Sequence, residues 1–293
     1  MTTLANVEDV ARAACEAVGL DSASLSLLHH HATPVYLLTS LSIVVRVSRG
    51  DDRDRASRAV AVTSWLATQD VPVIAPAPVQ QPAEVGDSWV TFWQYYPQQV
   101  GRAAPRAADL GAILRHLHSL DTAPPVPLRR YEPLTHLAAV LARQTRLSAD
   151  DHAWLDHRRL ELLAQYAQLS SELGVGFIHG DAYPGNTLWD GDRAILSDWD
   201  EVAVGPRELD LVNTHQGARM GRTAAERDAF TAAYGWDVTA WAGYPTLRAM
   251  RDVHTLASFI SRAADGDGKA AAEVAHRIAT LRDGDTEARW HSA

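Results

Sequence analysis

The chain has 293 residues, 46% of them hydrophobic, and a formal net charge of −9, which is enough apolar material for a large core or for two lobes. The acidity argues against a nucleic-acid partner, because neutralising phosphates takes clustered lysine and arginine. No apolar run approaches the roughly 20 residues of a membrane-spanning helix, no secretory signal is recognisable at the start, and Cys15 is the only cysteine. These features predict a cytoplasmic protein without disulfides or a membrane anchor.

The N-terminal region is predicted to combine two helices with a sheet. Apolar residues at helical spacing indicate an amphipathic helix over 7–18, and a second helix is expected over 54–69. The Pro-rich segment 71–78 must be extended, because a residue before proline avoids the helical region. Runs rich in Val, Ile, Leu and aromatic residues predict strands over 25–28, 35–38, 43–47 and 89–93.

The rest of the chain is predicted to be mostly helical. Apolar periodicity indicates helices over 108–120, 134–146 and 150–173, with Gly174 ending the last of them. Pro206 is well placed to open another helix. Amphipathic segments then continue to the C-terminus, and a Gly-Asp loop over 265–268 separates the last two helices.

One stretch gathers polar residues at the ends of short strands. His179-Gly180-Asp181 follows an apolar run, Asn186 follows a Pro-Gly turn, and a further apolar run over 194–196 leads to Asp198. The pattern predicts a β-hairpin that holds these polar side chains at one end. Taken alone, it would also suit a surface hairpin with solvated acids.

This set of side chains suits phosphoryl transfer, in which a protein mainly positions groups and neutralises charge. Asp181 would accept the proton of an attacking hydroxyl, and Asn186 and Asp198 offer the hard oxygen ligands that Mg²⁺ takes. The intervals match the kinase pattern H-x-D-x-x-x-x-N followed by an aspartate after a hairpin.

With Gly180 after His179 and Trp199 after Asp198, the sequence resembles the aminoglycoside phosphotransferase family. The resemblance implies an α+β, bilobal, protein-kinase-like fold. Its nucleotide-binding lobe, with an antiparallel sheet and a helix, would cover residues 1–95. A mostly helical lobe with the catalytic hairpin and the acceptor pocket would cover residues 96–293.

The resemblance also implies a nucleotide site in the first lobe. Arg46 occupies the slot where kinases place a lysine and would hold the phosphates, unless it is an outward-facing residue of an edge strand. Residues 93–96 would form the hinge, where Trp93 backs the purine and the main chain of Gln94 and Tyr96 bonds it. The alternative is that these aromatic residues only pack the core.

Further positions are implied around the catalytic stretch. Asp210 resembles the aspartate that bonds the catalytic-loop backbone, and with His179 it would support that loop rather than act in the chemistry. Asp200 and Glu201 would help to hold a cationic substrate or a second metal, or they form a solvated acidic turn.

The function implied is transfer of the γ-phosphoryl of ATP or GTP, with Mg²⁺, to a hydroxyl of a small molecule. The acceptor would be a cationic aminoglycoside, making the protein a resistance enzyme, or a sugar or amino alcohol of metabolism. A non-catalytic nucleotide-binding protein is the third alternative, because the loop over 29–34 has no glycine and the helix over 54–69 has no glutamate. A monomer or a homodimer is expected.

Overall fold

The structure is a computed structural model that describes residues 4–30, 34–49, 53–143 and 145–291. The chain divides into two compact units, each assembled from separate stretches of sequence. Unit 1 comprises Met1–Pro105, Ser119–Arg129 and Gly185–Val202, and unit 2 comprises Arg106–His118, Arg130–Pro184 and Ala203–Ala293. The lobes expected from the sequence, residues 1–95 and 96–293, are each one continuous segment, whereas each unit combines several stretches. The boundary after residue 95 stays a prediction.

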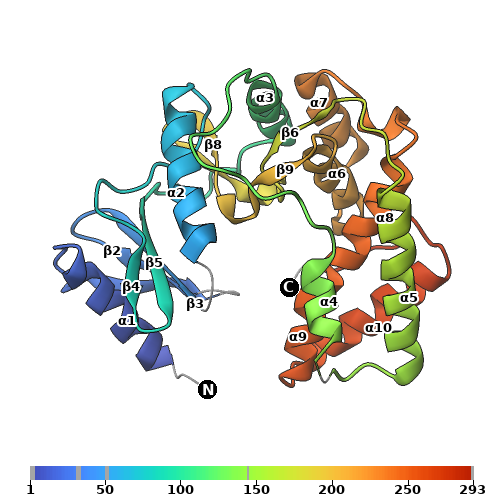
Figure 1. Ribbon diagram of the computed structural model, residues 1–293, viewed down its shortest axis with the longest axis horizontal. Helices are drawn as coiled ribbons and strands as arrows, with labels where there is room; N and C mark the ends of the chain where they lie inside the picture. Colours follow the sequence, from blue (N-terminus) through green and yellow to red (C-terminus); the bar gives the residue numbers. More distant parts are fainter. Residues whose placement is uncertain (1–3, 31–33, 50–52, 144, 292–293) are drawn as a thin grey trace. The chain divides into compact units, whose positions relative to one another are not determined.

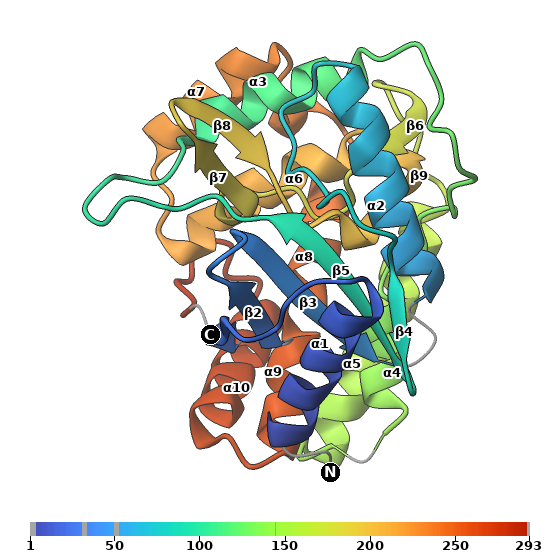
Figure 2. The ribbon, with the colours of Figure 1, turned by 90° about the vertical axis from the view of Figure 1, so that its left-hand side faces the viewer.

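Unit 1 contains an antiparallel five-stranded sheet with the order β1-β2-β3-β5-β4 (Figure 2). The predicted strands are confirmed, and most extend by a residue or two beyond the expected ranges. The glycine-free loop over 29–34 includes residues 31–33, which lie outside the described residues. The strands are β1 (Leu25–His30), β2 (Pro34–Leu38), β3 (Ile43–Arg49), β4 (Ala83–Val85) and β5 (Ser88–Gln94).

The two faces of this sheet have different partners. Val45 and Val47 on β3 are buried in a hydrophobic cluster with Phe92 of β5 and with helix α1 (Leu4–Ala17). Because side chains alternate across a strand, Arg46 projects from the opposite face. β3 is central in the sheet, paired with β2 and β5, so the alternative of an edge-strand arginine is wrong.

Unit 1 also holds the predicted hairpin. β7 (Thr187–Asp190) pairs with β8 (Arg193–Leu196) in antiparallel register, and the short 3₁₀ helix η2 (Trp199–Glu201) follows. Helix α2 (Arg53–Thr68) packs against both β5 and η2. The hairpin, η2 and α2 therefore belong to the same compact unit as Arg46.

Unit 2 is mostly helical, with one two-stranded sheet formed by β6 (Val175–Ile178) and β9 (Ala203–Pro206) (Figure 1). In the described part of the chain, no helix combines the length and the apolar character needed to cross a membrane. The helices of unit 2 are α3 (Ala107–His118), α4 (Thr135–Leu141), α5 (Ala149–Tyr166), α6 (Leu209–Gln216), α7 (Ala224–Tyr234), α8 (Tyr244–His254), α9 (Leu256–Ala264) and α10 (Gly268–Arg282).

Three boundaries expected in unit 2 are wrong. The helix expected over 134–146 is α4, which already ends at Leu141. Helix α5 ends at Tyr166 instead of continuing to residue 173. The reason is tertiary, because the buried carboxylate of Glu208 accepts hydrogen bonds from the backbone N–H groups of Glu172 and Leu173, at 2.7 and 2.9 Å. Pro206 does not open a helix but ends β9, a strand position at which a missing N–H is tolerated.

The C-terminal segment is bound to the helices of unit 2 by the buried Trp290. Two guanidinium groups contact its indole, with Arg219 at 4.1 Å and Arg277 at 4.9 Å from the ring centroid, and the indole N–H donates to Thr280 Oγ1. Arg219 also pairs with Asp252 of helix α8 at 2.9 Å. The segment therefore contributes to the position of α8.

Candidate active site

The hairpin of unit 1 joins the two predicted metal ligands through the backbone. The carbonyl oxygen of Asn186 accepts hydrogen bonds from both the N–H and the hydroxyl of Ser197, each at 2.8 Å. Asp198 comes next and has left-handed backbone geometry, with φ 62°. Aspartate tolerates this region better than most residues, and such geometry is concentrated at functional sites. The buried Trp199 anchors the turn by donating to the Leu196 carbonyl at 3.0 Å.

Arg46 links two of the acids after the hairpin. Its Nη1 donates to Asp198 Oδ1 at 3.1 Å, and its Nη2 lies 2.7 Å from Asp200 Oδ2. Burial raises the pKa of Asp200 above the usual value of an aspartate, although Arg46 acts in the opposite direction. The guanidinium fork is therefore the counter-charge of both carboxylates.

Glu201 also has arginine partners within unit 1. Arg129 donates to its Oε2, and Arg55 lies 3.6 Å from its Oε1. A cationic substrate at Asp200 or Glu201 would have to compete with these arginines. The substrate-binding role expected for the two acids stays a prediction.

The predicted hinge is partly engaged by its own chain. The Gln94 N–H donates to the Ala75 carbonyl, and the Ala75 N–H donates to the Tyr96 hydroxyl at 3.0 Å. Trp93 is buried, and its indole N–H donates to Thr91 Oγ1. Nucleotide binding at this hinge, which stays a prediction, would therefore rely on the Gln94 carbonyl and the Tyr96 N–H.

The donors of unit 1 fit a hard divalent cation. Asn186 supplies an amide oxygen and Asp198 a carboxylate that is 42% exposed. Among the described residues no group of three His, Cys, Asp or Glu side chains could hold a metal. Two protein oxygens suit a cation such as Mg²⁺, which keeps waters and takes phosphate oxygens as its remaining ligands.

In unit 2, the buried Asp210 holds the backbone before the predicted base. Its carboxylate accepts hydrogen bonds from the N–H groups of His179 and Gly180, at 2.7 and 2.8 Å. His118 Nε2 lies 3.1 Å from the same carboxylate. Burial alone would raise the pKa of Asp210, but the bonds from His118 and the His179 backbone outweigh it, and the pKa lies below the usual value. The charged carboxylate is thus the favoured form at neutral pH.

Asp181 has two side-chain partners that the sequence did not suggest. Arg251 Nη2 of α8 lies 2.6 Å from Asp181 Oδ1, and Asn213 Nδ2 of α6 donates to the same oxygen at 3.4 Å. Asp181 N–H donates to His179 Nδ1 at 3.2 Å, so that nitrogen is the acceptor of the ring. No motif marks Arg251 or Asn213, because each is one polar residue on an amphipathic helix.

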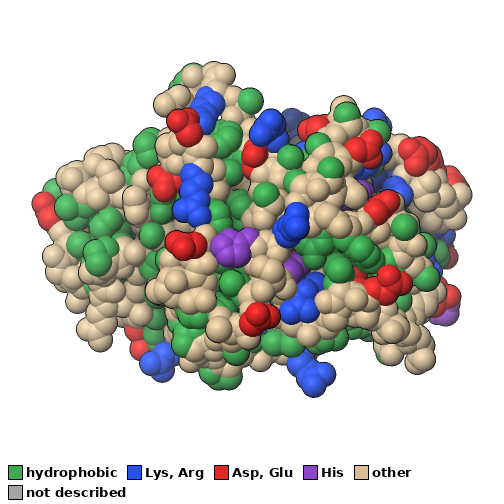
Figure 3. Space-filling view, turned by 90° about the horizontal axis from the view of Figure 1, so that it is seen from above, with side chains coloured by type: hydrophobic (Ala, Val, Ile, Leu, Met, Phe, Trp, Pro, Cys, Tyr) green, Lys and Arg blue, Asp and Glu red, His purple; other side chains and the backbone are tan. Residues whose placement is uncertain are grey.

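The surface in Figure 3 bears on the choice of partner. On the face shown, basic and acidic side chains of the described residues are interspersed, and the basic ones do not form a continuous patch. Such a face lacks the clustered positive charge that nucleic-acid binding uses. The exclusion of nucleic acid for the whole protein stays a prediction.

A comparison with protein families supplies the classification. The model described as the phosphotransferase enzyme family matches residues 25–250, which includes Arg46, Asp181 and Asp198. The chain belongs to the phosphotransferase enzyme family. The resemblance and the α+β, protein-kinase-like fold expected from the sequence are confirmed, and this family member is a small-molecule phosphotransferase. A comparison with curated proteins found no match.

Proteins with solved structures of related fold carry the names of different acceptors. The amicoumacin kinase hAmiN in complex with AMP-PNP, Ca²⁺ and Ami is 13% identical, with a TM-score of 0.70 and 91% and 90% of the two chains covered. A microcompartment-associated aminopropanol kinase is 18% identical, with a TM-score of 0.70 over 96% and 99%. Aminoglycoside phosphotransferase APH(3'')-Id from Streptomyces rimosus is 18% identical, with a TM-score of 0.61 over 87% and 99%. At these identities the likeness shows the shared fold.

Proposed function

We propose that this phosphotransferase moves the γ-phosphoryl group of ATP, or of GTP, to a hydroxyl group of a small molecule. The observation that carries the proposal is the family match over a segment containing Asp181, Asn186 and Asp198 at kinase-like intervals. Asn186 and Asp198 flank the same end of the hairpin through the bonds from Ser197. Two residues at the same end of a hairpin are placed to bind one cation together.

Asp181 is the proposed general base. Its carboxylate would accept the proton of the acceptor hydroxyl as that oxygen attacks the γ-phosphorus. Asp210 fixes the backbone before it by bonding the His179 and Gly180 N–H groups. In this proposal Asp210 is a positioning residue, and a kinase-like catalytic loop depends on such positioning rather than on covalent chemistry.

Unit 1 would bind the nucleotide and its metal. Asn186 and Asp198 would hold a divalent cation, proposed to be Mg²⁺, which when bound neutralises the phosphate oxygens. Arg46 would exchange part of its contact with Asp198 and Asp200 for phosphate oxygens, which a guanidinium fork binds in a similar geometry. The amicoumacin kinase complex with AMP-PNP and Ca²⁺ supports a nucleotide and a divalent cation for this fold.

The fold alone leaves the acceptor open, because one scaffold hosts many acceptors. By their names, related structures act on amicoumacin, on aminopropanol and on aminoglycosides. Both an antibiotic and a metabolic acceptor therefore fit the proposed reaction.

Nucleotide-dependent turnover tests this function. ADP or GDP release with Mg²⁺ is measured against a panel of cationic, neutral and anionic hydroxy compounds, with Asp181→Asn beside the natural protein. The proposal predicts acceptor-dependent release that falls by roughly 10²–10⁴-fold in Asp181→Asn. Asp228→Asn, at an exposed aspartate of α7, is the matched control and should keep full activity. Equal release by natural protein and Asp181→Asn would contradict the assignment.

A further inference from the structure

The carboxylate of Asp181 is held by two side chains of unit 2. Arg251 Nη2, from helix α8, lies 2.6 Å from Asp181 Oδ1, and Asn213 Nδ2, from helix α6, donates to the same oxygen at 3.4 Å. The Arg251 side chain is 18% exposed and the Asp181 side chain is 28% exposed. Because water and salt screen a partly buried ion pair less than an exposed one, this pair can fix the orientation of the carboxylate.

The same two helices also hold the main chain of the catalytic loop. Asp210 and Asn213 lie three residues apart on α6, so they share one face of that helix. Asp210 accepts hydrogen bonds from two main-chain N–H groups just before Asp181, at 2.7 and 2.8 Å. Helix α8 packs against α6 and adds Arg251. The loop and its carboxylate are therefore oriented by one pair of packed helices.

The next residue of α8 ties that helix to α6. Asp252 is buried, and its carboxylate accepts hydrogen bonds from Arg219 Nε at 3.0 Å and from Gln216 Nε2 at 3.1 Å. Gln216 is the last residue of α6. A fully bonded buried network of this kind is rigid, so it holds the two helices together near Arg251 and Asn213.

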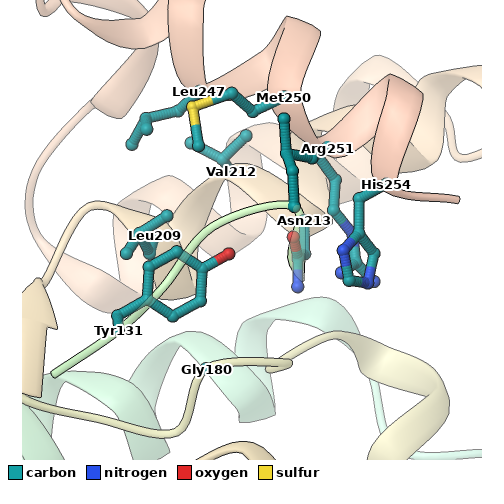
Figure 4. Close-up of a pocket in the computed structure, with 10 residues that line it drawn as sticks. Tyr131, Gly180, Leu209, Val212, Asn213, Leu247, Met250, Arg251 and His254 are labelled. Atoms are coloured by element: carbon teal, nitrogen blue, oxygen red, sulfur yellow. The ribbon is translucent and has the colours of Figure 1, made fainter. Parts of the chain in front are cut away.

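The cavity beside these residues favours a role for Arg251 other than ligand binding. Figure 4 shows Asn213, Arg251 and His254 gathered on one side, with Tyr131 on the other. The cavity volume is about 20 Å³, which is room for about one water molecule and too little for an acceptor. The charge of the guanidinium is balanced by Asp181. The surroundings of Arg251 therefore point to its contact with Asp181 as its role.

We propose that Arg251 is a positioning residue: by bonding Asp181 Oδ1, it fixes the carboxylate so that Oδ2 accepts the proton of the acceptor hydroxyl. The inference rests on the proposed function, in which Asp181 is the general base. As the hydroxyl oxygen bonds the γ-phosphorus, its proton passes to Oδ2 and the bond to the leaving nucleoside diphosphate breaks. A carboxylate held through one oxygen keeps the other oriented for this transfer.

Steady-state kinetics of ADP release tests this role, with Mg²⁺, ATP and the best acceptor of the panel. Arg251→Met should lower kcat by roughly 10²-fold, because a small misplacement of a reacting group reduces the rate by about that factor. The KM for ATP should change by less than about twofold, since the lost contact is to the base and not to the nucleotide. Arg251→Lys, which keeps the charge, should recover part of kcat.

Chemical rescue separates positioning from a general effect on the fold. Arg251→Ala leaves space for a free guanidinium ion, which should restore part of kcat at a concentration too low to unfold the protein. Sodium chloride at equal ionic strength should not restore it. Asp181 is 28% exposed, so water can hydrate the carboxylate once its partner is removed. Circular dichroism checks that each variant is folded.

A spectroscopic readout needs neither nucleotide nor acceptor. In protein with carbon-13 in the aspartate carboxyl groups, the Asp181 signal is identified by its loss in Asp181→Asn. That signal should shift in Arg251→Met, because its ion-pair partner is gone. Arg248→Gln is the matched control, since Arg248 lies one turn earlier on α8 and its Nη2 donates to the Thr286 carbonyl at 2.7 Å. It should leave both the signal and kcat unchanged.

An unchanged kcat in Arg251→Met, or an Asp181 signal that this substitution does not move, would overturn the inference. A kcat above that of the natural protein would also overturn it, because Arg251 would then restrain the base. The proposed function fails by a different result, equal ADP release from the natural protein and from Asp181→Asn. If no acceptor of the panel is turned over, the Asp181 signal still decides whether Arg251 holds the carboxylate.

Discussion

Arg46 and Asp198 lie far apart in the sequence, yet Arg46 Nη1 donates to Asp198 Oδ1 at 3.1 Å. The pair connects the central strand β3 with the turn after β8, and the second Arg46 nitrogen extends it to Asp200. In the proposed function the same guanidinium would hold the nucleotide phosphates. A residue with both tasks is expected to affect nucleotide binding more than acceptor binding.

Arg46→Met should raise the KM for ATP by about tenfold or more, because it removes a charge-assisted phosphate contact. Arg46→Lys should restore only part of the loss, since an ammonium cannot form the two-pronged contact. Ser48→Ala, on the same strand, is the control. Steady-state kinetics with ATP varied at fixed acceptor gives the comparison, and an unchanged KM in Arg46→Met would remove Arg46 from the nucleotide site.

Asp210→Ala should destabilise the protein by about 3–5 kcal/mol, because it leaves His118, the buried His179 N–H and the half-buried Gly180 N–H without their acceptor. Urea denaturation measures the loss. The exposed Asp228→Ala is expected to change stability by less than about 0.5 kcal/mol. If Asp210→Ala proved as stable as Asp228→Ala, the carboxylate would not be supporting the loop.

The stability should fall on acidification through His254. Burial lowers its pKa to about 3, whereas an unfolded histidine has a pKa near 6.5. The unfolded chain therefore binds the proton more tightly, so the contribution is complete above about pH 6.5 and is lost as the pH falls toward 3. The depressed pKa of Asp210 acts with the same sign below the usual aspartate range.

The expected size of this effect is a few kcal/mol between pH 7 and pH 4. Urea denaturation at several pH values should show a smaller decline in His254→Gln than in the natural protein. The exposed His157→Gln on α5 serves as the control and should decline like the natural protein. Parallel curves for all three proteins would show that His254 has the same pKa in the folded and the unfolded protein, which would contradict this prediction.

Trp290→Ala should destabilise unit 2 by about 3–5 kcal/mol, since the buried indole packs against the guanidinium groups of Arg219 and Arg277. Trp290→Phe should lose less, because it keeps an aromatic face but not the hydrogen bond to Thr280. Thermal unfolding of both variants, with the exposed Glu287→Ala as control, gives the order. A larger loss of stability in Trp290→Phe than in Trp290→Ala would contradict this packing.

Helices and strands could be predicted from the sequence where the pattern of apolar side chains alone determines them. The strands of unit 1 follow runs of Val, Ile and Leu between turn residues, and the hairpin over β7 and β8 follows its Pro-Gly entry. Helix α5 shows the limit of this reasoning. Its last expected residues have helical propensity, but Glu208, far along the chain, binds their backbone N–H groups instead.

The site was predictable to the extent that a motif encodes it. Asp181, Asn186 and Asp198 stand at recognisable intervals, and Asp210 follows at the expected place. The Arg251 pair with Asp181 was not predictable, because it depends on how α8 packs against α6. Long-range ion pairs leave no periodic signal, so the Arg251 pair with Asp181 required the structure.

In the proposed reaction, Asp181 activates a hydroxyl for attack on the γ-phosphorus of a nucleotide. Phosphorus NMR of a reaction with Mg²⁺, ATP and an acceptor from the panel tests it most directly. A new phosphomonoester signal should grow with ADP and be nearly lost in Asp181→Asn, while calorimetry should show nucleotide still bound to that variant. Nucleotide binding without a phosphomonoester for any acceptor, or an equal signal from Asp181→Asn, would contradict it.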